Sequence, residues 1–278
     1  MKKINYHTHL EFSYFNYINR PKVSSFTKWL EKIISFRFLI KDELRILSIK
    51  NILKKYKDYI FWNIQTFTEN EKILKLLKKP NIKNFFEFIG LDENIAKSRF
   101  EKYIKLAKKY NFFLSAHAPY SVHPKYIKLI YKLTPIFKIH CAESKEEVDF
   151  LLGKKNDMFK LFKKLGVLGN FKPPKKRPVE YLYYLKVLSP KTYLVHCTNI
   201  TEKEAYLIKK TGAKVIICPR SNFFLKVGFP NLNLFRKYKI PVFLGTDSLA
   251  SNEDLDLKNE ILFLERFLKE NYNESKIY

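Results

Sequence analysis

Short apolar segments alternate with longer segments of helical periodicity along the whole chain of 278 residues. The apolar segments have the length of buried strands, and the segments between them carry apolar residues at the spacing of amphipathic helices. Strands separated by helices pair in parallel, because the helix crosses one face of the sheet before the next strand begins. The predicted strands span residues 3–10, 59–67, 84–89, 112–116, 136–141, 192–196, 214–218 and 241–244.

Eight strand–helix units in a chain of this length predict an α/β protein whose strands close into a (β/α)8 TIM-like barrel. No linker divides the chain, so we expect a single metal-dependent hydrolase domain over residues 1–278. An open, doubly wound sheet is the alternative fold. No Gly-x-Gly-x-x-Gly sequence follows a predicted strand, which counts against a dinucleotide-binding sheet of that kind.

The composition excludes several classes of protein. Apolar residues make up 46% and aromatic residues 16% of the chain, which is typical of a globular protein and not of a disordered one. The three cysteines lack Cys-x-x-Cys spacing, so neither a disulfide framework nor a cysteine zinc site is expected. No signal-peptide pattern follows Met1, and no apolar run approaches the ~18 residues of a membrane span. We therefore expect a cytoplasmic protein with no membrane partner.

The net charge of +26 at pH 7 would attract an anionic partner such as nucleic acid, an acidic membrane or a charged metabolite. The lysines, however, are interleaved with apolar residues along segments such as 72–79 and 102–109, a pattern typical of solvated helix faces. The sequence contains no RNA-binding signature. Nucleic-acid binding on a barrel scaffold is the alternative from a different class, and it predicts salt-sensitive binding that survives loss of a metal.

The residues that carry chemistry lie where predicted strands end. His7 and His9 are two residues apart, so on a strand their side chains point to the same face. In a barrel the carboxyl ends of all strands meet at one mouth, where catalytic groups gather. The other ionisable residues at such ends are His117, His140, Glu143, His196 and Asp247. Several imidazoles and carboxylates at one mouth favour a divalent-metal site over ordinary packing.

Motifs at these strand ends resemble those of a known family. They read His7-Thr-His9-Leu-Glu-Phe, Ser115-Ala-His117-Ala-Pro-Tyr-Ser-Val, Ile139-His140-Cys-Ala-Glu143-Ser, Val195-His196-Cys, Cys218-Pro-Arg220-Ser-Asn222 and Gly245-Thr-Asp247-Ser-Leu-Ala-Ser-Asn252. In order and spacing they are similar to the motifs of the amidohydrolase superfamily, in its branch of mononuclear deaminases and chlorohydrolases. The resemblance covers almost the whole chain.

The resemblance implies a role for each of these residues. One divalent metal ion would be held by His7, His9, His140 and Asp247. Zinc is the expected metal, although iron or manganese would accept the same ligands. Glu143 would carry a proton between water and leaving group, His196 would hydrogen-bond that water or the oxyanion, and Asp247 would also take the water's proton. Binuclear members use a carboxylated lysine on the fourth strand, and segment 112–116 has none, so we expect one metal.

Within the superfamily, the phrases at 117–124, 143–147 and 218–222 look like those of aminofutalosine deaminases of the menaquinone pathway. The resemblance implies hydrolytic deamination of an aminopurine nucleoside that carries a carboxyphenyl group. His117 would line the substrate pocket, and Arg220 is the candidate partner for the carboxylate, because a guanidinium pairs with it bidentately. Arg220 could instead brace a loop, and Glu11 could hydrogen-bond the purine or ribose or simply cap the following segment.

Other reactions of the same superfamily stay open at this point. The substrate could be adenosine, S-adenosylhomocysteine, methylthioadenosine, guanine or a triazine, or the reaction could be hydrolysis of an amide or a halogenated ring. Members usually have a small β-sandwich beside the barrel, built from segments before and after it. This chain begins at the strand of His7, so we expect a compact barrel without that sandwich, a truncated form, or a start residue assigned too late in the sequence. Barrel surface exposed in this way would favour a homodimer.

Overall fold

The computed structural model describes residues 2–66 and 70–271. Within these ranges eight parallel strands form two four-stranded sheets, in the orders β1-β2-β3-β4 and β5-β6-β7-β8. The strands are β1 (Lys3–Thr8), β2 (Tyr59–Gln65), β3 (Ile82–Phe88), β4 (Phe113–Ala116), β5 (Phe137–Cys141), β6 (Thr192–His196), β7 (Lys214–Ile217) and β8 (Val242–Leu244). All eight predicted strands are therefore present. Phe67, the last residue of the predicted strand 59–67, lies outside the described residues.

The two sheets join into a closed barrel at two seams. At the first seam His140 N donates to the carbonyl oxygen of His117 at 2.8 Å, which ties β5 to the end of β4. At the second seam Thr246 N and Asp247 N donate to the carbonyl oxygen of His7 at 3.1 and 3.0 Å, which ties the end of β8 to β1. Glycine is required at position 245, because a Cβ atom there would lie 2.8 Å from His7 Cβ. The predicted barrel is thus confirmed, and its seams lie at candidate site residues.

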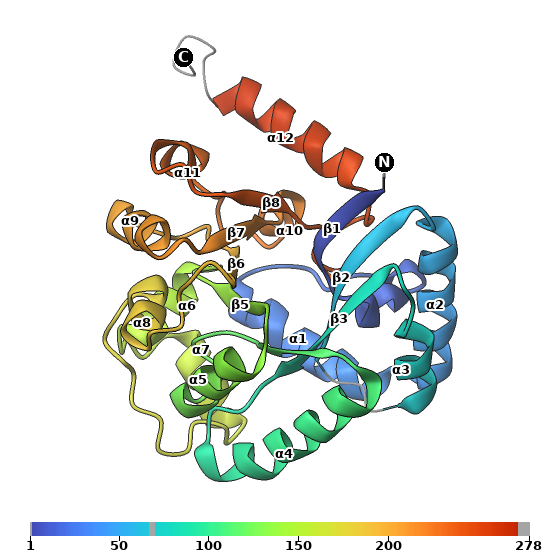
Figure 1. Cartoon of the computed structure of the whole chain (residues 1–278), viewed down its shortest axis with the longest axis horizontal. Helices are drawn as coiled ribbons and strands as arrows, with labels where there is room; N and C mark the ends of the chain where they lie inside the picture. Colours follow the sequence, from blue (N-terminus) through green and yellow to red (C-terminus); the bar gives the residue numbers. More distant parts are fainter. Residues whose placement is uncertain (1, 67–69, 272–278) are drawn as a thin grey trace.

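The helices surround the strands and bury their apolar faces against them (Figure 1). They are α1 (Phe26–Leu39), α2 (Asp42–Lys55), α3 (Glu71–Leu77), α4 (Glu93–Tyr110), α5 (Pro124–Leu133), α6 (Lys145–Leu151), α7 (Asp157–Lys164), α8 (Pro178–Tyr184), α9 (Glu202–Thr211), α10 (Pro219–Phe224), α11 (Leu232–Lys237) and α12 (Leu257–Asn271). Local sequence fixes their ends. At α9, Thr201 Oγ1 accepts from Glu204 N at 3.3 Å and Glu204 Oε2 accepts from Thr201 N at 2.9 Å, and Gly212 ends the helix at φ 70°.

Two short helical segments were not predicted. The 3-10 helix η1 (Leu10–Asn16) follows β1 directly, and α10 follows β7 directly. The apolar run of η1 lacks a helical period, and α10 is too short for a period to be recognised. Both segments carry residues that contact the site.

The barrel interior below the site is aromatic. Tyr6, Trp62, Tyr193 and Phe243 come from β1, β2, β6 and β8, and their rings contact one another at centroid distances of 4.6 to 5.7 Å. Side chains of such distant strands can meet only inside the barrel. Lys138 of β5 is buried among them, with Nζ 3.0 Å from the carbonyl oxygen of Tyr6. Burial lowers the pKa of Lys138 to about 7, so this lysine readily loses its charge.

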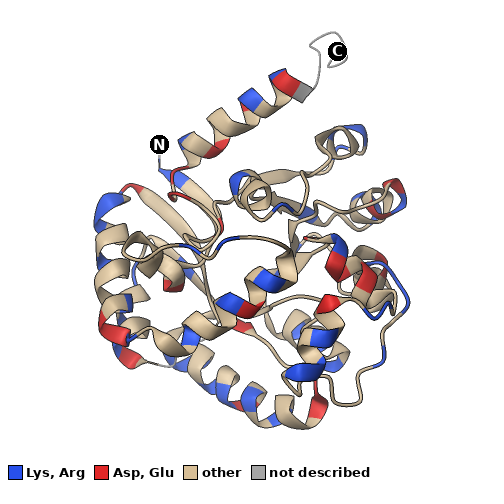
Figure 2. Cartoon of the chain, turned by 180° about the vertical axis from the view of Figure 1, so that it is seen from behind, with Lys and Arg blue, Asp and Glu red and all other residues tan. Residues whose placement is uncertain are grey.

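Many charged residues of the helices are exposed to solvent. In Figure 2, Lys and Arg are dispersed along the helices that face the viewer, with Asp and Glu among them. Several form exposed ion pairs, such as Lys125 Nζ with Glu93 Oε1 at 2.7 Å. This distribution agrees with the prediction of solvated helix faces. Of the helices in the described ranges, none has the length and apolar character needed to cross a membrane.

Candidate metal centre and active site

A cavity of about 340 Å³ opens at the carboxyl ends of the barrel strands. Its volume is within the range of small-molecule binding sites. Its polar lining includes His9, Glu87, His117, His140, Glu143, His196 and Asp247. Closure of the barrel therefore brings the predicted strand-end residues to one place, although they are far apart in the sequence.

His7, His9, His140 and Asp247 form one cluster at the floor of this cavity. The ligand atoms of the three histidines lie within 4.8 Å of one another. His7 Nε2 lies 3.2 Å from His140 Nε2, and Asp247 Oδ1 lies 3.6 Å from His7 Nε2 and 3.9 Å from His9 Nε2. Ligands bound tetrahedrally to zinc at about 2.0–2.1 Å stand roughly 3.4 Å apart. Three imidazoles and one carboxylate in this arrangement fit a single divalent metal ion.

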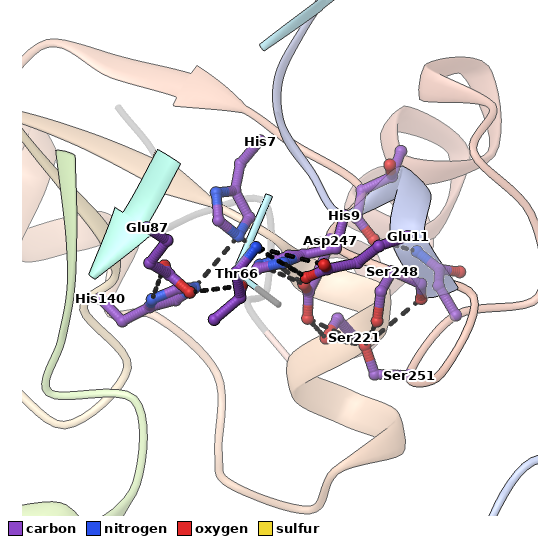
Figure 3. A network of polar contacts seen from close by, with 12 residues as sticks. His7, His9, Glu11, Thr66, Glu87, His140, Ser221, Asp247, Ser248 and Ser251 are labelled. Atoms are coloured by element: carbon purple, nitrogen blue, oxygen red, sulfur yellow. Dashed lines mark hydrogen bonds and ion pairs between the residues drawn. The ribbon is translucent and has the colours of Figure 1, made fainter. Parts of the chain in front are cut away.

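The hydrogen bonds of His140 direct one ring nitrogen toward this cluster. Its Nδ1 lies 2.8 Å from the carbonyl oxygen of His117. The same nitrogen lies 3.3 Å from Glu87 Oε1 (Figure 3). A carbonyl oxygen can only accept, so Nδ1 carries the proton and Nε2 keeps the lone pair that faces His7. Glu87, His117 and His140 also lie within metal-ligand distance of one another. Because Nδ1 of His140 is protonated, that second group is less suited to a cation than the first.

Burial sets the protonation states of the cluster. It lowers the pKa of His7 and of His140 well below the ordinary value, and the charge of Lys138 acts on His7 in the same direction. For Asp247 burial acts to raise the pKa, but the hydrogen bond with His7 and the charge of His9 outweigh it and hold the pKa well below its usual range. Neutral imidazole and ionised carboxylate are the forms in which these groups bind a metal.

Glu11, for which the sequence left two roles open, is buried in η1 behind His9 (Figure 3). Its Oε1 lies 3.5 Å from His9 Nδ1, and its Oε2 accepts from Gln65 Nε2 at 3.0 Å. Burial alone would lower the pKa of His9, but the contact with Glu11 and the charge of Glu87 raise it overall. Among the described residues that line the cavity, Glu11 is absent. Its carboxylate orients His9, so neither a purine contact nor simple capping describes its position.

Two serine hydroxyls hold Asp247 (Figure 3). Ser221 Oγ and Ser251 Oγ donate to Asp247 Oδ2 at 2.7 and 2.8 Å, which leaves Oδ1 directed at the histidines. Asp247 has a φ of 59° and His196 a φ of 75°, which is the left-handed conformation that residues other than glycine rarely adopt. Strain of this kind gathers at functional sites, where the surrounding structure enforces it.

Glu143 and His196 lie side by side, with Glu143 Oε1 3.6 Å from His196 Nε2. Asn222 Nδ2 lies 3.0 Å from His196 Nδ1 and donates to it, so His196 Nε2 carries the hydrogen that faces Glu143. Burial lowers the pKa of His196 to about 4. Burial, reinforced by the charge of Asp247, raises the pKa of Glu143 well above its usual range. The site therefore places an uncharged imidazole next to a carboxyl group that holds its proton more tightly than usual.

His117 lines the cavity. Its Nδ1 lies 2.6 Å from Ser121 Oγ, and its ring centroid lies 5.0 Å from that of His140. Burial lowers its pKa to about 3, so the imidazole is uncharged at neutral pH. His117 can therefore offer a neutral hydrogen-bonding group to a ligand in the cavity.

Arg220 lies elsewhere, contrary to the prediction that it meets a substrate carboxylate. Its Nη1 lies 2.8 Å from Asp254 Oδ1 and 3.9 Å from Glu260 Oε1, and its Nη2 lies 3.2 Å from Glu253 Oε2. Of the described side chains that form the cavity wall, none is that of Arg220. The guanidinium is held by carboxylates just before and within α12 and braces α10 against that helix. The loop-bracing role that the sequence left open describes this position.

Sequence reasoning missed several residues that support the site. Glu87 stands behind His140, Ser221 and Ser251 stand behind Asp247, and the Glu147 carboxylate accepts from Glu143 N at 2.8 Å. The sequence contained a recognisable feature for Glu87, Ser221 and Ser251. Glu87 is the one charged residue in the run Phe85-Phe-Glu-Phe88, and the two serines lie inside motifs already singled out.

The chain is similar in sequence to curated deaminases. An aminodeoxyfutalosine deaminase of Deinococcus radiodurans is 33% identical over 162 residues, which cover 54% of this chain and 38% of that protein. A 5-methylthioadenosine/S-adenosylhomocysteine deaminase of Caldanaerobacter subterraneus subsp. tengcongensis is 28% identical over 285 residues, which cover 94% of this chain and 59% of that protein. The chain thus spans less than two thirds of the length of these curated relatives.

A solved structure shows the same fold. Helicobacter pylori aminofutalosine deaminase in complex with methylthio-coformycin superposes with a TM-score of 0.80 at 25% identity, covering 97% of this chain and 68% of that chain. Residues 3–275 match the amidohydrolase family over almost the entire chain. On the strength of this match, and of the strand-end residues gathered in one barrel mouth, the chain belongs to the amidohydrolase family.

Proposed function

We propose that the chain is a metal-dependent hydrolase that deaminates an adenine nucleoside, with aminofutalosine as the first candidate substrate. The observation that carries the proposal is the buried carboxyl group of Glu143, which lies beside His196 at the floor of the cavity that holds the histidine–aspartate cluster. The Deinococcus relative and the Helicobacter structure, both named for aminofutalosine-type deamination, support the choice of substrate. That substrate would place the reaction in menaquinone biosynthesis.

The reaction joins a water oxygen to C6 of the adenine ring and releases the exocyclic nitrogen as ammonia. A divalent cation held by His7, His9, His140 and Asp247 would supply Lewis-acid activation of that water. Burial raises the pKa of Glu143 and so favours its protonated form, which can donate a proton to the neighbouring ring nitrogen; as a carboxylate, Glu143 can take a proton from the water. The same group can then pass that proton to the departing nitrogen.

His196 and Asp247 assist this proton transfer in different ways. His196 is neutral, and its Nε2 hydrogen can donate to the attacking oxygen as negative charge develops there. Asp247 is ionised, and its Oδ1 faces the histidines, so it can bind the cation and accept a proton from the water. The ligand set suits zinc, and iron or manganese would accept it as well.

The test is ammonia release from purified, metal-loaded protein. The panel is aminofutalosine, methylthioadenosine, S-adenosylhomocysteine, adenosine and guanine, each with and without a chelator. We expect chelator-sensitive release that is fastest from aminofutalosine. Faster release from another adenine nucleoside would keep the reaction and change the substrate. A protein that binds one metal per chain and yet releases ammonia from no member of the panel would refute the proposed deamination.

A further inference from the structure

The outer half of the cavity differs from its polar floor. Helix α1 contributes Phe26, Trp29, Ile33 and Arg37 to the cavity wall, and this spacing places all four on one helix face. Helix α4 contributes Ile95 and Arg99 in the same way, one turn apart. On both helices an apolar surface is thus followed, one turn later, by a guanidinium group.

The two arginines bring like charges into one largely apolar cavity. Burial lowers the pKa of Arg37 to about 10, and the charge of Arg99 acts in the same direction, against the opposing charge of Glu11. Within residues 2–66 and 70–271, the Arg99 guanidinium has no hydrogen-bond or ion-pair partner. Asp92, an acidic residue of the cavity wall, uses its Oδ1 to cap α4, accepting from Asn94 N at 2.9 Å.

Arg99 differs in this respect from Arg220 and Arg177, two partly buried arginines that carboxylates match. Arg220 has Asp254 at 2.8 Å, and Arg177 has Glu204 at 2.7 Å. A guanidinium withdrawn from water without a carboxylate is unfavourable, and a bound anion would remove that penalty. The planar guanidinium group matches a carboxylate in shape and forms two parallel hydrogen bonds with it. The cavity therefore has the charge and the hydrogen-bond donors to accept an anion at its outer end.

We propose that Arg37 and Arg99 form the anion-binding end of the cavity, and that this end takes a carboxylate which an apolar spacer joins to the sugar of the nucleoside. The inference rests on the proposed function, because it assumes that the base lies at the metal-binding floor. The apolar faces of α1 and α4 would cover the spacer. A phosphate attached directly to the sugar has no such spacer and would leave Phe26, Trp29 and Ile33 without a ligand surface to contact.

The test compares two nucleosides that differ at this end. Aminodeoxyfutalosine carries a carboxylate on an aryl spacer, and methylthioadenosine carries an uncharged methylthio group. For the R37M and R99M variants we expect kcat/KM for the carboxylated nucleoside to fall roughly 10- to 100-fold further than that for methylthioadenosine, mainly through KM. R99K keeps the charge and should recover part of the loss. K97M removes an exposed charge from the same helix and should change neither substrate, because Lys97 lies outside the cavity wall.

Other outcomes overturn the inference. Equal losses on both nucleosides would show that the arginines support the fold or the floor of the site and do not bind a carboxylate. Unchanged kcat/KM for the carboxylated nucleoside in both variants would also refute it. Faster turnover of adenosine 5′-monophosphate than of aminodeoxyfutalosine by the unsubstituted protein would show that the anion-binding end takes a phosphate and not a carboxylate. Residual turnover of methylthioadenosine by each variant shows that it has folded.

A failed deamination assay would not leave the anion-binding end untested. If the unsubstituted protein releases ammonia from neither nucleoside, the proposed function fails. Binding of both nucleosides is then measured by calorimetry. Tighter binding of the carboxylated nucleoside, lost in R99M and kept in K97M, would still support the anion-binding end. Equal binding of the two nucleosides would refute it.

Discussion

Replacing Glu87 by glutamine should weaken metal binding and, at the same time, stabilise the metal-free protein. Glu87 Oε1 lies 3.3 Å from His140 Nδ1, and its Oε2 accepts from Thr66 Oγ1 at 2.7 Å. The amide has nearly the same shape but no negative charge to orient the imidazole. Loss of such a carboxylate behind a metal-binding histidine lowers metal affinity by about 10- to 100-fold, or roughly 1.4 to 2.8 kcal/mol.

The stability effect has the opposite sign and depends on pH. Burial raises the pKa of Glu87 from the usual 4.5 to about 7. Between these values the unfolded chain has released a proton that the folded chain keeps, so rising pH favours the unfolded state. The accumulated penalty is roughly 3 kcal/mol at pH 7 and above, and it is absent below pH 4.5. The E87Q variant lacks this penalty, so its advantage in unfolding free energy should grow from pH 4.5 to 7 and then stay level.

Two measurements check this pair of effects. Zinc competition titrations give the metal affinity of the native protein and of E87Q, and urea unfolding in chelator between pH 4.5 and 8 gives the stability difference. For the zinc titration, E143Q is the matched control, because it makes the same change at another buried carboxyl group that does not stand behind a histidine of the cluster. Equal zinc affinity of E87Q and the native protein, or a stability difference that does not vary with pH, would refute the role assigned to Glu87.

Three further substitutions test other contacts. E143Q should lose turnover by at least about 100-fold yet keep one metal per chain by equilibrium dialysis, and full activity would remove Glu143 from the mechanism. S251A removes a hydrogen bond to Asp247 Oδ2 and should lower metal affinity about 10-fold in the same zinc titration, whereas an unchanged affinity would show that Ser221 alone holds the carboxylate. R220M should lower the free energy of unfolding in urea by roughly 2 kcal/mol. It should not change the ratio of kcat/KM between carboxylated and uncharged nucleosides. A selective loss of kcat/KM for the carboxylated nucleoside would restore the predicted substrate role of Arg220.

The sequence alone was sufficient to predict the barrel and the residues that lie at its mouth. Strand ends are local features, because apolar runs and helix caps such as Thr201 and Gly212 mark where elements begin and end. In a parallel barrel all carboxyl ends meet at the same mouth, so residues that end different strands must lie near one another. For this reason the positions of His7, His140 and Asp247 in the chain were enough to group them, and His140 and Asp247 both lie within 4 Å of His7 in the folded protein.

Only the tertiary structure determined which side chains contact the histidines and Asp247, and which residues line the rest of the cavity. Glu87 meets His140, and Ser221 meets Asp247, through side chains of different strands and loops whose approach no periodicity encodes. Arg220 shares a motif with Ser221 and yet points to the carboxylates of α12, because the turn of α10 sends neighbouring side chains in different directions. Arg37 is indistinguishable in the sequence from any solvated helix residue. It faces the cavity because α1 packs over the barrel mouth, a placement set by contacts between segments distant in the chain and not by local pattern.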